Sequence, residues 1–368
     1  MTNPTFYLPV TLIQDFINDT FIRLGVPTDD ARICADVLIT SDLRGIESHG
    51  VGRLKYYYDR IKSGQHQVIT NITVIKETLS TAVLDGNHGM GMIIGTHAMS
   101  KAIEKAKIVG LGAVAVRNST HFGIDGYYAL MAVKENMVGL SFTNARPSIA
   151  PTFGVEPMLG TNPIAFGAPT DGECPFLFDA ATSIIQRGKV EVHSREEKIL
   201  ESGYVVDQNN QFMTDPDFIL SELGKKRAAF LPLGGEGEIF GGYKGYDLAT
   251  MVEILCASFQ NGSFLNALSG LDDHGHDRTF NVGHFFLAIN IGYFTDIELF
   301  KQTTGNILRD LQNSKKAPGH DHIYFAGEKE FESEKIIRVK GIPIIPNLQK
   351  ELKFIQNDLN LTGYEFPF

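Results

Sequence analysis

Cysteine is scarce in this sequence, and nothing in its spacing would make the cysteines act together. Cys34, Cys174 and Cys256 are the three present; they lie far apart and form no Cys-x-x-Cys pair. This pattern argues against a disulfide framework and against a zinc site built on thiolates. It is typical of a protein from a reducing compartment, so we expect a cytoplasmic location.

Long apolar runs and clusters of positive charge are also missing. No segment approaches the ~20 apolar residues of a membrane span, and residues 1–16 lack the basic region and apolar core of a signal peptide. Lysine and arginine form no basic run, and the formal net charge is −10, which argues against nucleic acid as the main partner. We therefore expect no membrane and no nucleic acid among the partners, and anion binding only at local sites.

What is present is an ordinary globular composition. The 368 residues are 43% hydrophobic and 21% charged, with no internal repeat and no low-complexity linker. Helical periodicity dominates at first and gives way to a mixed α/β pattern near residue 70. We therefore divide the chain into an N-terminal helical region at 1–70, a mixed body at 71–330, and an amphipathic C-terminal segment at 331–368 that packs back on the body.

The first 110 residues give five clear elements. Apolar spacing predicts helices over 11–24 and 28–43, with Thr28 as a candidate N-cap of the second. Strands are expected over 72–75 and 82–84, and a helix over 96–109.

A glycine-rich stretch precedes that last helix. Gly89 and Gly91 begin a near-match to the dinucleotide-binding G-x-G-x-x-G, but Ile94 stands in the place of the third glycine. We therefore favour a glycine-rich turn over a Rossmann phosphate loop.

His121 stands at the mouth of a strand-to-helix turn. Residues 114–116 are expected to end a short buried strand, the polar run 117–120 is expected to leave it, and Asp125 is a plausible N-cap of the following helix. An imidazole has an unperturbed pKa of about 6.5, so it can take or give a proton near neutral pH. The alternative is a histidine that is merely hydrogen-bonded in a turn.

His49 and Arg53 form the second polar candidate. They stand four residues apart, so they would share one face of a helix, and Gly50 and Gly52 would leave that face uncluttered. The spacing fits an alternative equally well, in which Arg53 forms an ion pair with Glu47 or Asp59 and His49 is merely exposed.

Further polar groups follow predicted strands or precede predicted helices. Asp179 ends a short apolar run, at the kind of strand end where α/β proteins collect ligands. Lys244 lies in a glycine-rich segment before a helix expected over 248–259, where a lysine opposes the helix dipole. This indicates an anion between them, although a solvated lysine fits as well. The histidines at 274–278 lack carboxylates or cysteines at ligand spacing, so we expect no metal.

Taken together, several blocks resemble a known family. They are DLRGIESHGVGRL at 42–54, VRNSTHFG at 116–123, GTNPIAFGAP at 160–169, DAATS at 179–183, LPLGG at 231–235, GGYKGYDLA at 241–249, GHFFLAI at 283–289 and AGEKE at 326–330. Their order is similar to that of the non-Rossmann malate and L-lactate dehydrogenases, which include ureidoglycolate and sulfolactate dehydrogenases, diketogulonate reductases and cyclic imine reductases. The resemblance implies an α/β protein with a mixed sheet flanked by helices, the nicotinamide-binding fold of the L-sulfolactate dehydrogenase type, assembled as a homodimer.

The resemblance also implies roles for individual residues. The proton-transferring histidine falls on His121, our preference, or on His49, and the substrate-binding residues on Arg53 and Ser48. The cofactor, NAD with NADP as an alternative, would contact Thr143, Asn144, Asp179, Ala180, Ala181, Thr182, Lys244, Gly327, Glu328 and Lys329.

The expected reaction is hydride transfer between NAD(H) and a 2-hydroxy or 2-oxo acid. The blocks at 42–50 and 160–169 are most similar to malate-type members, so malate and oxaloacetate are the expected pair. A second carboxylate needs a further group, and Asn118, Arg146 or a residue of a partner subunit are candidates. Alternatives are another 2-oxo acid such as pyruvate or diketogulonate, a cyclic imine carboxylate, or a non-catalytic binding protein that retains the fold.

Overall fold

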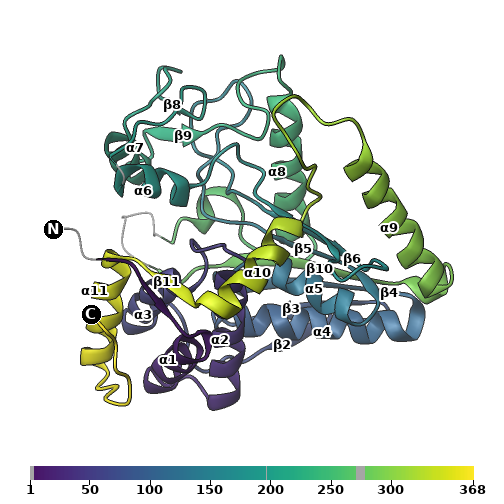
Figure 1. Ribbon diagram of the computed structural model, residues 1–368, viewed down its shortest axis with the longest axis horizontal. Coiled ribbons are helices and arrows are strands. Elements are labelled where there is room, and N and C mark those ends of the chain that lie inside the picture. The colour runs from purple at the N-terminus through teal and green to yellow at the C-terminus, as the bar shows by residue number, and fades with distance from the viewer. Residues whose placement is uncertain (1–3, 196, 271–277) are drawn as a thin grey trace.

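A seven-stranded mixed sheet runs through the middle of the molecule (Figure 1). The computed structural model describes residues 4–195, 197–270 and 278–368. The elements in these residues, in chain order, are β1 (Phe6–Leu8), α1 (Val10–Arg23), α2 (Thr28–Leu43), η1 (Val51–Arg53), α3 (Leu54–Lys62), β2 (Thr73–Glu77), β3 (Thr81–Asp85), α4 (Gly91–Val109), β4 (Leu111–Ser119), α5 (Gly126–Lys134), β5 (Met137–Thr143), β6 (Ile164–Ala168), β7 (Phe176–Ala180), α6 (Arg187–Arg195), β8 (Val205–Asp207), α7 (Pro216–Gly224), β9 (Ala228–Phe230), α8 (Gly242–Ala257), η2 (Leu265–Leu268), β10 (Val282–Asn290), η3 (Ile291–Tyr293), α9 (Ile297–Asn313), α10 (Glu328–Lys340), β11 (Ile342–Ile344) and α11 (Pro346–Asp358).

The strand order of this sheet is β2-β3-β4-β10-β5-β6-β7, and β3 with β4 is its parallel pair. Side chains of β10 alternate between two cores because successive residues of a strand point to opposite faces. Phe286 and Ala288 pack under α4 and α5, whereas Phe285 packs with Val252 and Cys256 of α8. Helices therefore cover both faces of the sheet, as expected.

The N-terminal helices and the C-terminal segment share one hydrophobic core. Buried side chains of α1, α2 and α3 pack with those of β11 and α11, and β1 pairs antiparallel with β11. The C-terminal segment therefore packs mainly against the N-terminal helices. The boundaries near 70 and 330 stay predictions.

A smaller unit with its own core lies between β7 and α8. Its buried residues include Ile185, Val190, Val205, Ile219 and Phe230, from α6, α7, β8, β9 and the segments between them. Figure 1 shows this unit above the N-terminal helices. It thereby forms one wall of the cavity described below.

Four local predictions were wrong in detail. Thr28 is the first residue of α2 and Pro27 occupies the cap position. Strand β4 continues through the polar residues to Ser119, because their side chains are paired at the strand end. Helices α4 and α8 begin five and six residues earlier than expected, at Gly91 and Gly242, because glycines there allow close backbone packing.

The glycine-rich stretch before α4 packs the helix rather than framing a phosphate loop. A Cβ on Gly91 would lie 2.2 Å from the Thr120 carbonyl oxygen and 2.6 Å from that of His121. The Gly91 N–H donates to the Thr120 hydroxyl over 2.9 Å. Gly91 therefore lets α4 press directly against the turn that carries His121.

Within the described residues, no helix combines the length and the apolar character needed to cross a membrane.

Candidate active site

Five of the predicted site residues line one cavity. It has a volume of about 300 Å³, and its walls include His49, Arg53, His121, Thr143 and Asn144. These residues come from the turn before α3, the turn after β4 and the end of β5. The fold therefore brings together the two polar candidates, which stand about 70 residues apart in the sequence.

The turn before α3 presents His49 and Arg53 differently from the prediction. His49 lies in a turn and Arg53 ends the short 3-10 helix η1, so the two do not share one α-helix. The buried Asp42 carboxylate fixes this turn by accepting the Val51 N–H over 2.7 Å. A Cβ on Gly50 would lie 1.9 Å from Asp42 Oδ1, which explains the glycine.

Arg53 is anchored by backbone rather than by a carboxylate. Its Nε donates to the Ser48 carbonyl oxygen over 2.6 Å, and Asp59 is taken by Lys55 over 2.6 Å. Within the described residues, Arg53 forms no ion pair with Glu47 or Asp59, so the alternative pairing is wrong. Its terminal nitrogens remain for a ligand, and its role as carboxylate anchor stays a prediction.

His121 is held by two groups at the same ring nitrogen. The Tyr57 hydroxyl lies 2.6 Å from Nδ1, and the Gly123 N–H donates to Nδ1 over 3.3 Å. Burial, followed by the charges of His49 and Arg53, places the pKa of His121 well below its usual value. His121 is therefore neutral at pH 7 and able to act as a base.

His49 stacks on His121, with ring centroids 5.6 Å apart. Its Nδ1 lies 2.9 Å from the Ser48 hydroxyl, so Ser48 orients this ring. Burial and the adjacent Arg53 charge lower the pKa of His49 to about 4. Two neutral histidines thus face the cavity, and the assignment of the acid/base to one of them stays a prediction.

The cavity is positively charged. Arg53, Arg60, Arg146 and Arg187 line it, and its lining contains no aspartate or glutamate. Burial, and then the neighbouring Arg187, lower the pKa of Arg146. Within the described residues Arg146 has no ion-pair partner, whereas Arg187 pairs with Glu191 over 3.0 Å. Arg146 can therefore bind an anionic ligand.

Several of these wall residues were missed by the sequence analysis. Tyr56 and Arg60 follow Arg53 at helical spacings of three and seven, a pattern that could have placed them on one face of α3. Arg187 comes from the smaller unit, where nothing in the sequence marks its approach to the cavity.

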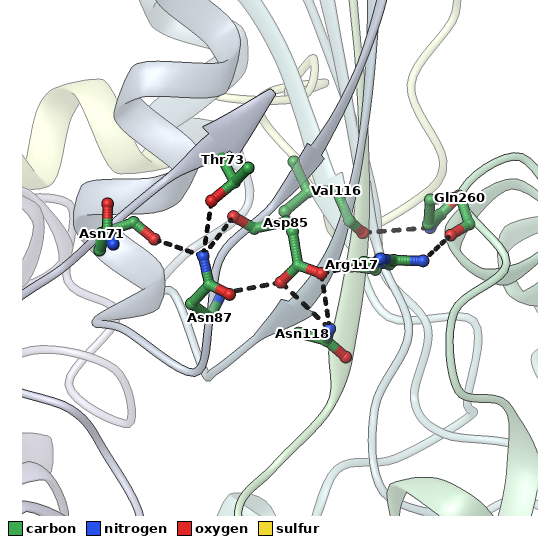
Figure 2. A network of polar contacts seen from close by, with 8 residues as sticks. All are labelled: Asn71, Thr73, Asp85, Asn87, Val116, Arg117, Asn118 and Gln260. Atoms are coloured by element: carbon green, nitrogen blue, oxygen red, sulfur yellow. Dashed lines mark hydrogen bonds and ion pairs between the residues drawn. The ribbon is translucent and has the colours of Figure 1, made fainter. Parts of the chain in front are cut away.

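Asn118, a predicted candidate for the second carboxylate, lies elsewhere. Figure 2 shows its side chain turned to Asp85, whose oxygens accept from Asn118 Nδ2 over 2.9 and 3.1 Å and from Arg117 Nε over 2.8 Å. Asn87 joins the same network and donates to the Asn71 carbonyl and the Thr73 hydroxyl. The Asn118 side chain is therefore used to pair polar groups at the end of β4. Arg146 is the remaining candidate, within this chain, for binding a second carboxylate.

Most of the predicted cofactor residues lie on three segments that meet around β7. The Leu233 N–H donates to the Thr182 carbonyl over 2.8 Å, which ties the loop before α8 to the chain after β7. The Leu177 N–H donates to the Ala326 carbonyl over 3.0 Å, which brings Gly327, Glu328 and Lys329 to the same strand. Asp179, Ala180 and Ala181 lie between these two junctions.

The side chains of these segments differ in whether they already have hydrogen-bond or ion-pair partners. Lys244, the third residue of α8, is exposed and forms no ion pair in the part of the chain described. Asp179 accepts the Gly126 N–H over 2.7 Å, and burial raises its pKa to about 6. Glu328 is occupied by His322 over 2.8 Å. A free cation and a carboxylate are groups that fit the phosphates and the ribose hydroxyls of a nicotinamide cofactor.

Other predicted contacts have structural partners. Thr143 Oγ1 lies 2.8 Å from His284 Nδ1, and Asn144 Oδ1 accepts the Gly283 N–H over 2.8 Å. The Thr182 hydroxyl donates to the Thr161 carbonyl over 3.0 Å. Asp125 occupies the N-cap position of α5 as predicted, but its side chain accepts the Ser141 hydroxyl instead of capping the helix. Any cofactor contact of Thr143, Asn144 or Thr182 would therefore involve the backbone or a shared hydrogen bond.

Residues 278–368 and the other described ranges contain no group of three or more His, Cys, Asp or Glu that could hold a metal ion. The histidines at 274 and 276 lie outside the described residues.

Comparisons with known proteins agree with the resemblance seen in the sequence. A family model described as malate/L-lactate dehydrogenase matches residues 8–353. A malate dehydrogenase of Pyrococcus abyssi is 43% identical over 97% of this chain and 96% of that protein. The crystal structure of malate dehydrogenase from Entamoeba histolytica matches with a TM-score of 0.95 and 42% identity, over 99% of this chain and all of that one.

The predicted fold type is confirmed by a further solved structure. Sulfolactate dehydrogenase from Methanocaldococcus jannaschii matches with a TM-score of 0.85 and 36% identity, over 96% of this chain and 98% of that chain. Like that protein, the chain has a mixed sheet flanked by helices. It belongs to the malate/L-lactate dehydrogenase family.

Proposed function

We propose that this protein is an oxidoreductase that transfers a hydride between NAD(H) and malate or oxaloacetate. One observation carries the proposal: a cavity lined by four arginines and no carboxylate also contains two neutral histidines. A small acid with two negative groups matches the charges, and a neutral imidazole can take the proton of its hydroxyl.

The two carboxylates of the substrate would bind to different arginines. Arg53 lies beside the histidines and holds the carboxylate next to the reacting carbon through its planar fork. Arg146, across the cavity on the loop after β5, holds the far carboxylate. A monocarboxylate such as pyruvate would leave Arg146 without its anion.

His121 is the proposed acid/base, and His49 orients the substrate. In oxidation, His121 Nε2 takes the hydroxyl proton while the C–H bond is fixed towards the nicotinamide. Ser48 holds His49, which stacks against His121 and borders Arg53. In reduction the proton returns to the alkoxide oxygen, whose charge the nearby arginines stabilise.

NAD(H), when bound, supplies or takes the hydride. Lys244 would hold its phosphates, and Asp179, with the backbone at 180–182 and at 327–329, would hold its ribose groups. Asp179 favours NAD because a carboxylate accepts from a ribose 2′-hydroxyl and repels a 2′-phosphate.

The decisive experiment measures nicotinamide absorbance with a panel of acids. Oxaloacetate, pyruvate and a cyclic imine carboxylate are each tested with NADH and with NADPH. A second charge pair is worth ~1–3 kcal/mol, so oxaloacetate should exceed pyruvate in kcat/KM by about tenfold or more. Equal efficiencies, or a preference for pyruvate or the imine, would overturn the malate assignment. If neither NADH nor NADPH is oxidised with any of these acids, the protein would be a non-catalytic binding protein that retains the fold.

We also propose that the enzyme is a homodimer. Large apolar side chains are exposed on α8 and on α9, the helix at the right of Figure 1: Met251, Ile254, Leu299, Ile307 and Leu311. Such surfaces mark interfaces between subunits. Light scattering should give twice the 40.6 kDa chain mass, and Ile254→Glu should reduce the measured mass to that of a single chain.

The three free cysteines agree with the proposed cytoplasmic location.

A further inference from the structure

Tyr57 reaches the candidate acid/base from a different part of the fold. It belongs to α3, is fully buried, and places its hydroxyl 2.6 Å from His121 Nδ1. No ligand contact is needed to explain this position, because Tyr57 does not line the cavity. The contact therefore acts on His121 itself.

The second group at Nδ1 fixes the direction of the Tyr57 hydrogen bond. The Gly123 N–H can only donate, so in the neutral ring Nδ1 is an acceptor and the proton lies on Nε2. The Tyr57 hydroxyl must then donate to Nδ1 as well. Gly123 has a φ of +85°, and a Cβ there would lie 2.4 Å from Val37 Cγ1, so glycine secures this backbone position.

The reaction requires Nδ1 to change its role. A base that takes a hydroxyl proton at Nε2 must carry its own proton on Nδ1, and the imidazolium that results carries protons on both nitrogens. In these states Nδ1 becomes a donor, for which the Gly123 N–H offers no acceptor. A tyrosine hydroxyl can serve in both directions because it donates and accepts.

We propose that Tyr57 is a positioning residue that keeps His121 hydrogen-bonded in each of its protonation states by reversing the direction of its hydroxyl. The inference rests on the proposed role of His121 as acid/base. In the free enzyme Tyr57 donates to Nδ1 of the neutral ring, whose proton lies on Nε2. When the oxo acid is bound for reduction, the ring is the imidazolium, and its Nε2–H points to the substrate oxygen. When Nε2 has taken the hydroxyl proton, Nδ1–H donates to the Tyr57 oxygen.

The surroundings make this reversal necessary. His49, Arg53, His66 and His284 all oppose a positive charge on His121, and Tyr56 packs against the ring at 5.8 Å. Within the described residues no carboxylate bonds to His121. Tyr57 is therefore the acceptor available to the buried imidazolium, and without it that N–H would be unpaired.

The test compares Tyr57→Phe with Tyr58→Phe, the same substitution one residue further along α3. Tyr58 donates to Asp358 over 2.5 Å, away from the cavity. Nitrogen NMR of protein labelled with ¹⁵N-histidine reports whether Nδ1 is unprotonated and whether it accepts a hydrogen bond, and His121→Gln assigns the signal. We expect an unprotonated, hydrogen-bonded Nδ1 in the wild type and in Tyr58→Phe, and a weakened bond in Tyr57→Phe.

Kinetics supply the second measurement. In Tyr57→Phe, kcat should fall roughly tenfold to a hundredfold with KM for the oxo acid little changed, as for other groups that orient a catalytic residue. The rate of reduction should decline at a pH about one unit lower than in the wild type, because the imidazolium loses its acceptor. Tyr58→Phe should retain the wild-type kcat and pH profile.

The outcomes separate this inference from the proposed function. A protonated Nδ1 in the neutral wild-type ring, or an unchanged Nδ1 signal in Tyr57→Phe, would overturn the inference even if the enzyme oxidises malate. A normal kcat in a folded Tyr57→Phe would overturn it as well. If the enzyme converts no acid, the proposed function is wrong. The NMR measurement still shows whether Tyr57 is hydrogen-bonded to His121 Nδ1.

Discussion

Two polar clusters near the end of β4 look alike in the sequence and differ in the structure. At Arg117 and Asn118 the polar groups satisfy one another around Asp85 (Figure 2). A few residues further on, the cluster around His121 contains arginines that have no carboxylate among the lining residues. Buried polar groups that are paired stabilise a fold, whereas a cation without an ion-pair partner in a cavity, such as Arg146, indicates a site for an anionic ligand.

The largest expected effect lies in the second cluster. His121→Ala should lower kcat by roughly 10²–10⁴-fold, because it removes the acid/base, with little change in KM. His49→Ala should act more on KM. His97→Ala, on the exposed side of α4, is the control and should match the wild type. A folded His121→Ala with near-normal kcat would reassign the acid/base.

Arg53→Lys tests whether a positive charge alone is sufficient. A lysine cannot reproduce two parallel hydrogen bonds to a carboxylate, so KM for the oxo acid should rise by about tenfold to a hundredfold. The matched control is Arg32→Lys on the exposed face of α2, where Arg32 pairs with Asp29. Wild-type substrate titrations with Arg53→Lys would show that Arg53 is not the anchor.

Arg146→Gln should change specificity more than turnover. Loss of one charge pair should lower kcat/KM for oxaloacetate by about tenfold and leave pyruvate nearly unchanged. Arg187→Gln provides the comparison, since Arg187 lines the same cavity from α6. If Arg187→Gln shows the selective loss instead, the far carboxylate binds against the smaller unit.

The smallest effect on activity is expected at Asp85. Burial would raise the pKa of Asp85, but the Asn87 N–H, Arg117 and Asn118 more than offset this, so its pKa lies below the usual value. The paired carboxylate therefore stabilises the fold above the unfolded pKa of about 3.9, and this contribution disappears as the pH falls through the lower folded value.

Asp85→Asn should reduce the free energy of unfolding by about 1–3 kcal/mol at pH 7, with kcat unchanged. The difference from the wild type should shrink below about pH 4. Asp171→Asn, in an exposed pair with Arg309, should cost less. A loss of stability at pH 7 that persists unchanged at pH 3 would exclude the charge of Asp85 as the cause.

The elements could be predicted from periodicity and the site only in part. Apolar spacing placed α1, α2 and β3 to within a few residues because each buries a regular face. It misjudged the starts of α4 and α8, where glycine-mediated packing against distant backbone extends the helix. Local patterns contain no information about such long-range contacts.

The site residues follow the same rule. His121 and Arg53 could be singled out because each stands in a local pattern and in a family block. Arg187 could not, since its place beside the cavity depends on how the smaller unit docks. Asn118 was a poor candidate because the sequence does not reveal that Asp85 already binds it.

The pairing of β1 with β11 has a consequence for how the chain is made. Arg53 directly precedes helix α3, which carries Tyr57, and the core of this helix is completed by residues near 350 and beyond, with Tyr58 bonded to Asp358. On the ribosome, the N-terminal helices emerge long before their partners and expose Phe16 and Phe21, which are buried in the finished fold. The sheet and the His121 turn can form first, whereas the carboxylate anchor is positioned only when synthesis is nearly finished. Unreleased chains should therefore bind chaperones and have no activity.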